Sequence, residues 1–211
     1  QEEGYGALID MTYAKSSTLS HVVEIDYMDE DINFNDLGFL ARNNYARLRY
    51  VMSFSKLDMG PSLSNYRTTL IAEQQYNLDD GLVTDGGLYW RSSIFLPRRQ
   101  TLRMGVGYMP ERFEDIDSRG NGSYQVDDRI WADLVLATDS GRVASYSVGM
   151  GVLQEHLDDW TVNAKAGVTY RPVDWMSVDF DLDYRQRNGW LVYQGGRNFG
   201  AYSGSEWQPK L

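Results

Sequence analysis

The sequence contains no cysteine, so neither disulfide bonds nor thiolate metal sites contribute to its stability or chemistry. It also lacks any apolar run approaching the roughly 18 residues that a membrane-spanning helix needs. Histidine occurs only twice in 211 residues, which leaves few candidates for acid–base chemistry. Basic residues number 20 against 30 acidic ones, and the net charge of -10 argues against a nucleic-acid-binding protein.

A two-residue hydrophobic alternation is present along most of the chain. It is clearest in residues 101–108, 144–152 and 161–170, where every second residue is apolar and its neighbours are polar or small. Successive side chains of a strand point to opposite faces, so each segment has one apolar and one polar face. Strands of about ten residues with this pattern are typical of a transmembrane β-barrel.

The pattern predicts about ten strands, each bounded by turn or loop residues. They are expected at residues 4–14, 19–28, 45–56, 64–77, 86–97, 100–109, 126–138, 141–153, 159–171 and 174–187. Tight connections at 15–18, 57–62, 97–99, 139–141 and 172–174 alternate with mostly longer ones at 29–44, 77–85, 110–125, 155–158 and after 187. An up-and-down barrel has short periplasmic turns at one rim and longer external loops at the other. The prediction is therefore an all-β, antiparallel, up-and-down transmembrane barrel formed by residues 1–211 as one region.

An eleventh strand is expected to begin near the end of the sequence, around Trp207. Bacterial barrels have an even number of strands. Two alternatives follow: ten strands close and the tail folds over or into the lumen, or these residues are part of a larger barrel. We favour the larger barrel, with the missing strands supplied by the rest of the polypeptide.

The expected apolar faces can be tested for charge, because Lys or Arg facing lipid costs about 2–4 kcal/mol at mid-bilayer. The alternate positions in 46–54, 130–136 and 176–184 carry no charge, whereas strand 64–77 leaves its outward face ambiguous. Most strand charges lie on the opposite faces, where we expect them to line the lumen. These residues are Arg47, Arg49, Arg91, Arg103, Arg129, Asp133, Lys165, Asp179, Asp181, Asp183 and Arg185.

Two arrangements of the lumen remain open. With the last hairpin centred on 172–174, Lys165 faces Asp181 and Asn163 faces Asp183. In one arrangement, acidic and basic stripes oppose each other across an open pore and orient polar solutes. The acidic stripe is Asp179, Asp181 and Asp183, and the basic stripe is Arg47, Arg49, Arg91 and Arg103. In the other, the same charges form a salt-bridge network that fills a closed lumen.

The sequence offers little evidence of catalysis or metal binding. Acidic loop residues at 29–31, 111–117 and 155–159 are suitable oxygen ligands for calcium bridging to lipopolysaccharide, but they lack the spacing of a dedicated site. His156 beside Asp158 and Asp159 is one conceivable acid–base pair, although solvated loop charge is the favoured interpretation. A phosphate-binding glycine loop is absent. We therefore expect no enzymatic activity, no resident metal and no cofactor.

Two segments resemble a known bacterial family. The first is Leu37-Gly38-Phe39-Leu40-Ala41-Arg42-Asn43-Asn44, similar to a Gly-Phe-x-x-Arg-Asn/Asp segment, and the second is Asp181–Leu211. The second contains Asp183-Tyr184-Arg185, Gly189-Trp190-Leu191-Val192 and Trp207-Gln208-Pro209. These resemble the barrel region of the domain-of-unknown-function 5916 family, whose members carry an N-terminal module like carbohydrate-binding family 9. The resemblance implies an outer-membrane location and a link to glycans, but it transfers no glycan-binding or catalytic residue.

The expected function is that of an outer-membrane β-barrel in a Gram-negative bacterium, acting as a pore for polar solutes. Its partners would be the lipid bilayer, lipopolysaccharide and an envelope protein. A non-transporting scaffold that anchors a surface or periplasmic partner is the main alternative. A soluble antiparallel sandwich or ligand-binding barrel is a third, and it predicts extraction without detergent.

Overall fold

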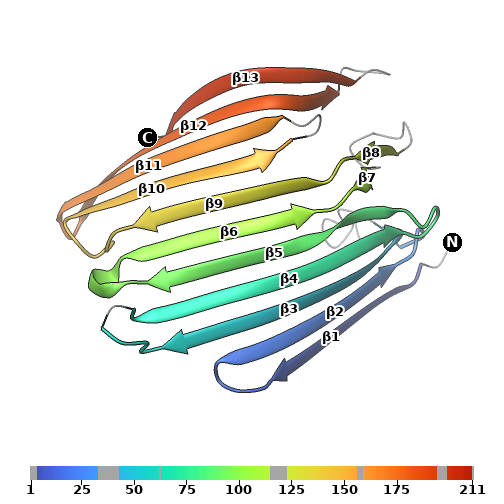
Figure 1. Ribbon diagram of the computed structural model, residues 1–211, viewed down its shortest axis with the longest axis horizontal. Coiled ribbons are helices and arrows are strands. Elements are labelled where there is room, and N and C mark those ends of the chain that lie inside the picture. The colour runs from blue at the N-terminus through green and yellow to red at the C-terminus, as the bar shows by residue number, and fades with distance from the viewer. Residues whose placement is uncertain are drawn as a thin grey trace. The chain divides into compact units, whose positions relative to one another are not determined.

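The computed structural model describes residues 4–32, 43–61, 63–114, 123–155, 159–193 and 199–210, with side chains up to residue 187. This part of the chain is all-β and antiparallel, apart from one short 3-10 turn at Pro97–Arg99 (Figure 1). Within it, no helix has the length and apolar character needed to cross a membrane.

The described residues form an 11-stranded sheet whose strands follow one another in chain order, and a separate 2-stranded sheet (Figure 1). The large sheet contains β1 (Gly6–Ala14), β2 (Leu19–Met28), β3 (Tyr45–Leu57), β4 (Asn65–Asn77), β5 (Val83–Phe95), β6 (Thr101–Met109), β9 (Arg129–Ala137), β10 (Ala144–Gln154), β11 (Trp160–Val173), β12 (Met176–Tyr193) and β13 (Phe199–Lys210). The small sheet consists of β7 (Arg112–Glu114) and β8 (Tyr124–Val126).

The ten predicted strands are all present, and the structure differs from the prediction in the expected connections at 110–125 and after residue 187. The expected loop at 110–125 contains the paired strands β7 and β8 except for the last residue of β8, Val126, which falls at the start of the strand expected at 126–138. The eleventh strand expected near Trp207 is present as β13, which begins earlier, at Phe199, and pairs with β12, which extends to Tyr193. The backbone of β13 therefore continues the sheet and does not fold over it.

Two compact units are distinguished by their internal contacts. Unit 1 comprises Gln1–Phe54, Thr69–Tyr89 and Met109–Asp128, and unit 2 comprises Ser55–Thr68, Trp90–Tyr108 and Arg129–Leu211. Unit 1 thus holds β1, β2, β7 and β8 with most of β3, and unit 2 holds β9 to β13 with nearly all of β6.

In unit 1 the register gives β1, β2 and β3 one apolar and one charged face. Ile9 pairs with Ile25, and Ile25 pairs with Leu48. One residue further along, Glu24 pairs with Arg49. Arg49 also forms an ion pair with Glu73 of β4. Glu73 therefore lies on the charged face, which resolves the ambiguity of strand 64–77.

In unit 2 the register of the last predicted hairpin differs by two residues from the expected one. Lys165 pairs with Asp183, not Asp181, and Asn163 pairs with Arg185, not Asp183. The difference arises from the turn, which lies between Val173 and Met176 and displaces the pairing by three residues, whereas the register shift between Tyr170 and Val173 moves it back by one. An extra residue at such a bulge changes every pairing beyond it.

The apolar face is exposed along the strands of both units. Among the residues whose side chains are described, only Ile32 and Val126 are buried apolar residues. By contrast, mid-strand side chains such as Leu48 at 55%, Val148 at 55% and Phe180 at 50% remain accessible. Large exposed apolar surfaces mark contact with another protein or with a membrane. The described chain is thus an amphipathic sheet with almost no buried apolar core.

Candidate functional site on the polar face of the sheet

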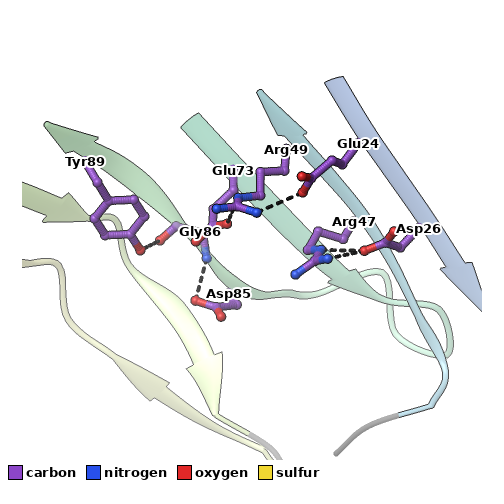
Figure 2. A network of polar contacts seen from close by, with 8 residues as sticks. All are labelled: Glu24, Asp26, Arg47, Arg49, Glu73, Asp85, Gly86 and Tyr89. Atoms are coloured by element: carbon purple, nitrogen blue, oxygen red, sulfur yellow. Dashed lines mark hydrogen bonds and ion pairs between the residues drawn. The ribbon is translucent and has the colours of Figure 1, made fainter. Parts of the chain in front are cut away.

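In unit 1, Arg47 and Arg49 of β3 form ion pairs with carboxylates of the neighbouring strands (Figure 2). Arg47 donates from Nε to Asp26 Oδ2 at 2.7 Å, and its Nη2 contacts the same oxygen. Arg49 lies between two acids, with Nη1 2.9 Å from Glu24 Oε2 and Nε 3.3 Å from Glu73 Oε2. We call these five residues the unit 1 ion-pair cluster.

Burial makes the Asp26–Arg47 pair the most constrained part of this cluster. The Asp26 side chain is only 3% exposed, and its second oxygen, Oδ1, is buried without a hydrogen-bond partner. A buried carboxylate is tolerated when a cation stays beside it, because removal of that cation leaves an uncompensated charge. Arg47 therefore has a structural role here, and its charge is neutralised locally.

In unit 2, Arg91 of β5 lies over an aromatic ring. Its guanidinium carbon is 5.7 Å from the centroid of the Trp131 ring, a cation–π arrangement. Gly105 of β6 gives this ring its space, because a Cβ at that position would lie 2.8 Å from Trp131 and 2.6 Å from Asp133 Oδ1. The glycine thus lets two larger side chains of β9 lie close to the β6 backbone.

A polar hollow of about 420 Å³ lies on β9 to β12. Its lining includes Gly149 and side chains of both charge signs, among them Asp133, Asn163, Lys165, Asp183 and Arg185. Lys165 Nζ is 3.8 Å from Asp183 Oδ1, and the Lys165 side chain is 65% exposed. This loose ion pair leaves the ammonium group accessible to solutes. We call this space the central hollow.

The three aspartates of β12 face the same side, but they have different partners. Asp179 accepts hydrogen bonds from Thr169 Oγ1 at 2.6 Å and Ser177 Oγ at 3.2 Å. Asp181 lies over Gly167, where a Cβ would come within 2.6 Å of its Oδ1. Asp183 lies beside Lys165, whose Nζ is 3.8 Å from its Oδ1. The three carboxylates therefore share one side of β12, and that of Asp179 is held by neutral hydrogen-bond donors.

The predicted lumen residues divide between the two units. Arg47 and Arg49 belong to unit 1, and the other nine belong to unit 2. The arginines of the predicted basic stripe are also not equivalent, since two are ion-paired and Arg91 is stacked on Trp131. Sequence reasoning missed the acidic partners Glu24, Asp26 and Glu73, although opposite charges on adjacent predicted strands were a usable signal.

The loop residues considered for metal binding or catalysis are partly described. Asp29 accepts hydrogen bonds from the backbone of Tyr5 and Ile32, and Glu155 accepts one from Thr161 Oγ1 at 2.5 Å. His156, Asp158, Asp115 and Asp117 lie outside the described residues. Within the described ranges, no group of three or more His, Asp or Glu side chains is arranged to hold a metal ion.

The other histidine, His21 of β2, contacts two tyrosines on adjacent strands. Its Nδ1 is 2.7 Å from Tyr50 Oη, and its ring stacks between those of Tyr13 and Tyr50 at centroid distances of 6.1 and 6.0 Å. By its register with Met52, His21 lies on the apolar face, close to the first tight turn. This position makes it part of an aromatic cluster and separates it from the ion-pair cluster.

A family model described as a domain of unknown function, DUF5916, matches residues 1–204. The chain belongs to the DUF5916 family. This match confirms the family expected from the two sequence segments. Residues 37–42 of the first segment lie outside the described residues, and the second segment is described only as backbone beyond residue 187. No curated protein and no solved structure matches the chain. The DUF5916 assignment therefore gives no residue a role, and function has to be argued from the geometry.

Proposed function

We propose that this DUF5916 region forms the membrane-embedded wall of an outer-membrane β-barrel in a Gram-negative bacterium. In this proposal the apolar face contacts lipid, and the polar face lines a water-filled pore for polar solutes. The observation that carries the proposal is the exposed, uncharged apolar face beside a charged polar face on the same strands.

The exposed apolar side chains of unit 2 favour contact with lipid on energetic grounds. Val148, Met150 and Val152 of β10 are 55%, 64% and 39% exposed, and β9 and β12 present similar side chains. Apolar surface left in water forfeits about 25 cal/mol per Å² relative to a buried position. An acyl-chain environment removes that deficit without a second protein layer. The uncharged character of these positions also avoids the cost of a cation in lipid.

Exposed aromatic side chains support the same orientation, because they concentrate near strand ends. Tyr13, Tyr146 and Tyr170 lie beside tight turns and are 64%, 55% and 49% exposed. At the opposite strand ends, Tyr108 and Trp160 are 41% and 39% exposed. Tyr and Trp are enriched where a membrane meets water, so these positions suit the two interfaces.

A second candidate function is that of a non-transporting membrane scaffold. The unit 1 ion-pair cluster favours it, because paired charges on the polar face resemble the filling of a closed lumen. The central hollow favours the pore instead, since its lysine is accessible and loosely paired. Both functions place the apolar face in lipid.

Conductance through planar bilayers tests the pore. The full-length protein, purified in detergent and reconstituted, is expected to give discrete current steps. A scaffold would need detergent for extraction and insert into vesicles, yet give no steps. Extraction of a monodisperse protein with plain buffer would contradict both membrane functions and support a soluble β-protein.

A further inference from the structure

A second hollow, of about 630 Å³, lies in unit 2 beside the tight turns that follow β5 and β9. Its lining includes Arg98 and Arg99 of the turn after β5, and Arg103 of β6. Arg103 alternates with Gly105, so it belongs to the polar face that also carries Asp133. We call this space the arginine hollow.

The positive charge of the arginine hollow is not neutralised in the described part of the chain. Arg98, Arg99 and Arg103 form no ion pair or side-chain hydrogen bond with described residues. Asp139 is the acidic residue in the lining, but its carboxylate accepts a hydrogen bond from Gly141 N at 2.9 Å and lies 4.0 Å from Arg142 Nε. In a chain with a net charge of -10, three guanidinium groups around one hollow, without an ion pair to any described residue, are a pronounced local exception.

The backbone conformation of the turn is a second indication of a functional site. Arg98 and Arg99 have φ values of 63° and 58°, in the left-handed region. The turn is closed by a hydrogen bond from Leu96 N to Gln100 O at 2.9 Å. Glycine or asparagine normally occupies such positions, because a longer side chain is strained there. Strained residues of this kind cluster at functional sites, and here both carry a cation into the same hollow.

We propose that the arginine hollow binds the phosphate group of a solute or of a lipid headgroup. Guanidinium groups bind phosphate oxygens through planar, charge-assisted hydrogen bonds, and more than one cation suits a dianion better than a carboxylate. The site's role rests on the proposed function: at the tight-turn mouth of a pore, a group of arginines attracts anions, as arginine and lysine rings do in phosphate-conducting channels.

Titration calorimetry of the full chain in neutral detergent tests the binding of inorganic phosphate. The heat of binding is measured in micelles and does not depend on conduction through a pore. The double variant Arg98→Gly/Arg99→Gly removes two charges and places glycine at both left-handed positions, so the turn is expected to fold. Arg103→Gln removes the third charge without changing the turn. Each variant is expected to weaken phosphate binding by at least about tenfold, as for loss of a charged hydrogen bond. Lys15→Gln, in another tight turn, is the matched control and should bind like wild type.

The source of the phosphate is distinguished by adding phosphatidylglycerol or phosphatidylcholine to the micelles. Competition by phosphatidylglycerol alone identifies a lipid headgroup, whereas unchanged phosphate affinity identifies a soluble phosphate. No saturable heat from the wild type, or equal binding by the glycine variant, would overturn the proposal. Phosphate binding without current steps would support the phosphate site and refute the pore. Current steps without phosphate binding would support the pore and refute the phosphate site.

Discussion

Arg47 holds the carboxylate of Asp26 by two contacts to one oxygen, and the Asp26 side chain is almost completely buried on β2. The pair joins adjacent strands on the polar face, at positions that are directly paired in the register. A long polar side chain thus fixes two strands of unit 1 to each other.

Replacement of Arg47 by leucine should lower the free energy of unfolding by about 3–5 kcal/mol, because it leaves Asp26 buried and charged without a partner. The double variant Arg47→Leu/Asp26→Leu should recover much of that loss. Urea-induced unfolding in detergent measures both. A double variant no more stable than the single one would show that the ion pair is not what Asp26 depends on.

Introduction of lysine at Val148, in the middle of β10, should impair insertion into lipid vesicles by about 2–4 kcal/mol, the cost of a cation on the lipid face. The matched control is Val143→Lys, since Val143 is 58% exposed, close to the 55% of Val148, but lies in a tight turn. The measurement is the fraction of each variant that inserts into lipid vesicles. Equal fractions for the two variants would show that the Val148 side chain faces water and not lipid.

Substitution of Gly105 by alanine should destabilise the chain by about 1–3 kcal/mol, as expected for overpacking. The added methyl group would lie 2.6 Å from Asp133 Oδ1 and 2.8 Å from Trp131, so the side chains of β9 must move. Gly149→Ala is the control with a smaller expected effect, because its nearest contact would be Val135 Cγ2 at 3.1 Å. Thermal unfolding of the two variants provides the comparison.

The Lys165→Glu substitution should make the pore more selective for cations, because it replaces an accessible ammonium group in the central hollow by a second carboxylate beside Asp183. The reversal potential in a potassium chloride gradient measures this selectivity. Lys15→Glu makes the same charge change in a turn and should alter the potential less. Identical potentials for the two variants would remove Lys165 from the conduction path.

The strands were predictable because alternation is a local property of the sequence. The faces of β10, for example, follow directly from residues 144–152, with no knowledge of what lies beside them. The outward face of β4 could not be assigned from the local pattern alone. The assignment required the contact of Glu73 with Arg49 on another strand, which the local pattern does not contain.

Register and turn conformation were the parts that sequence reasoning missed. The pairing of Lys165 with Asp183 depends on the position of the turn between Val173 and Met176 and on a bulge after Tyr170, and the hydrophobic pattern specifies neither. The arginine hollow was missed because left-handed positions are normally recognised by glycine or asparagine, whereas Arg98 and Arg99 occupy them here.

The most direct measurement of lipid contact uses the absence of native cysteine, which lets single introduced cysteines be spin-labelled without background. Labels at successive positions 144–152 of β10 in vesicles would be tested for collision with oxygen, which concentrates in lipid, and with a water-soluble nickel complex. Our account predicts strict alternation, with oxygen favoured at even positions and nickel at odd ones. Uniform nickel access along β10, or collision rates that do not alternate between even and odd positions, would contradict a lipid-facing apolar side.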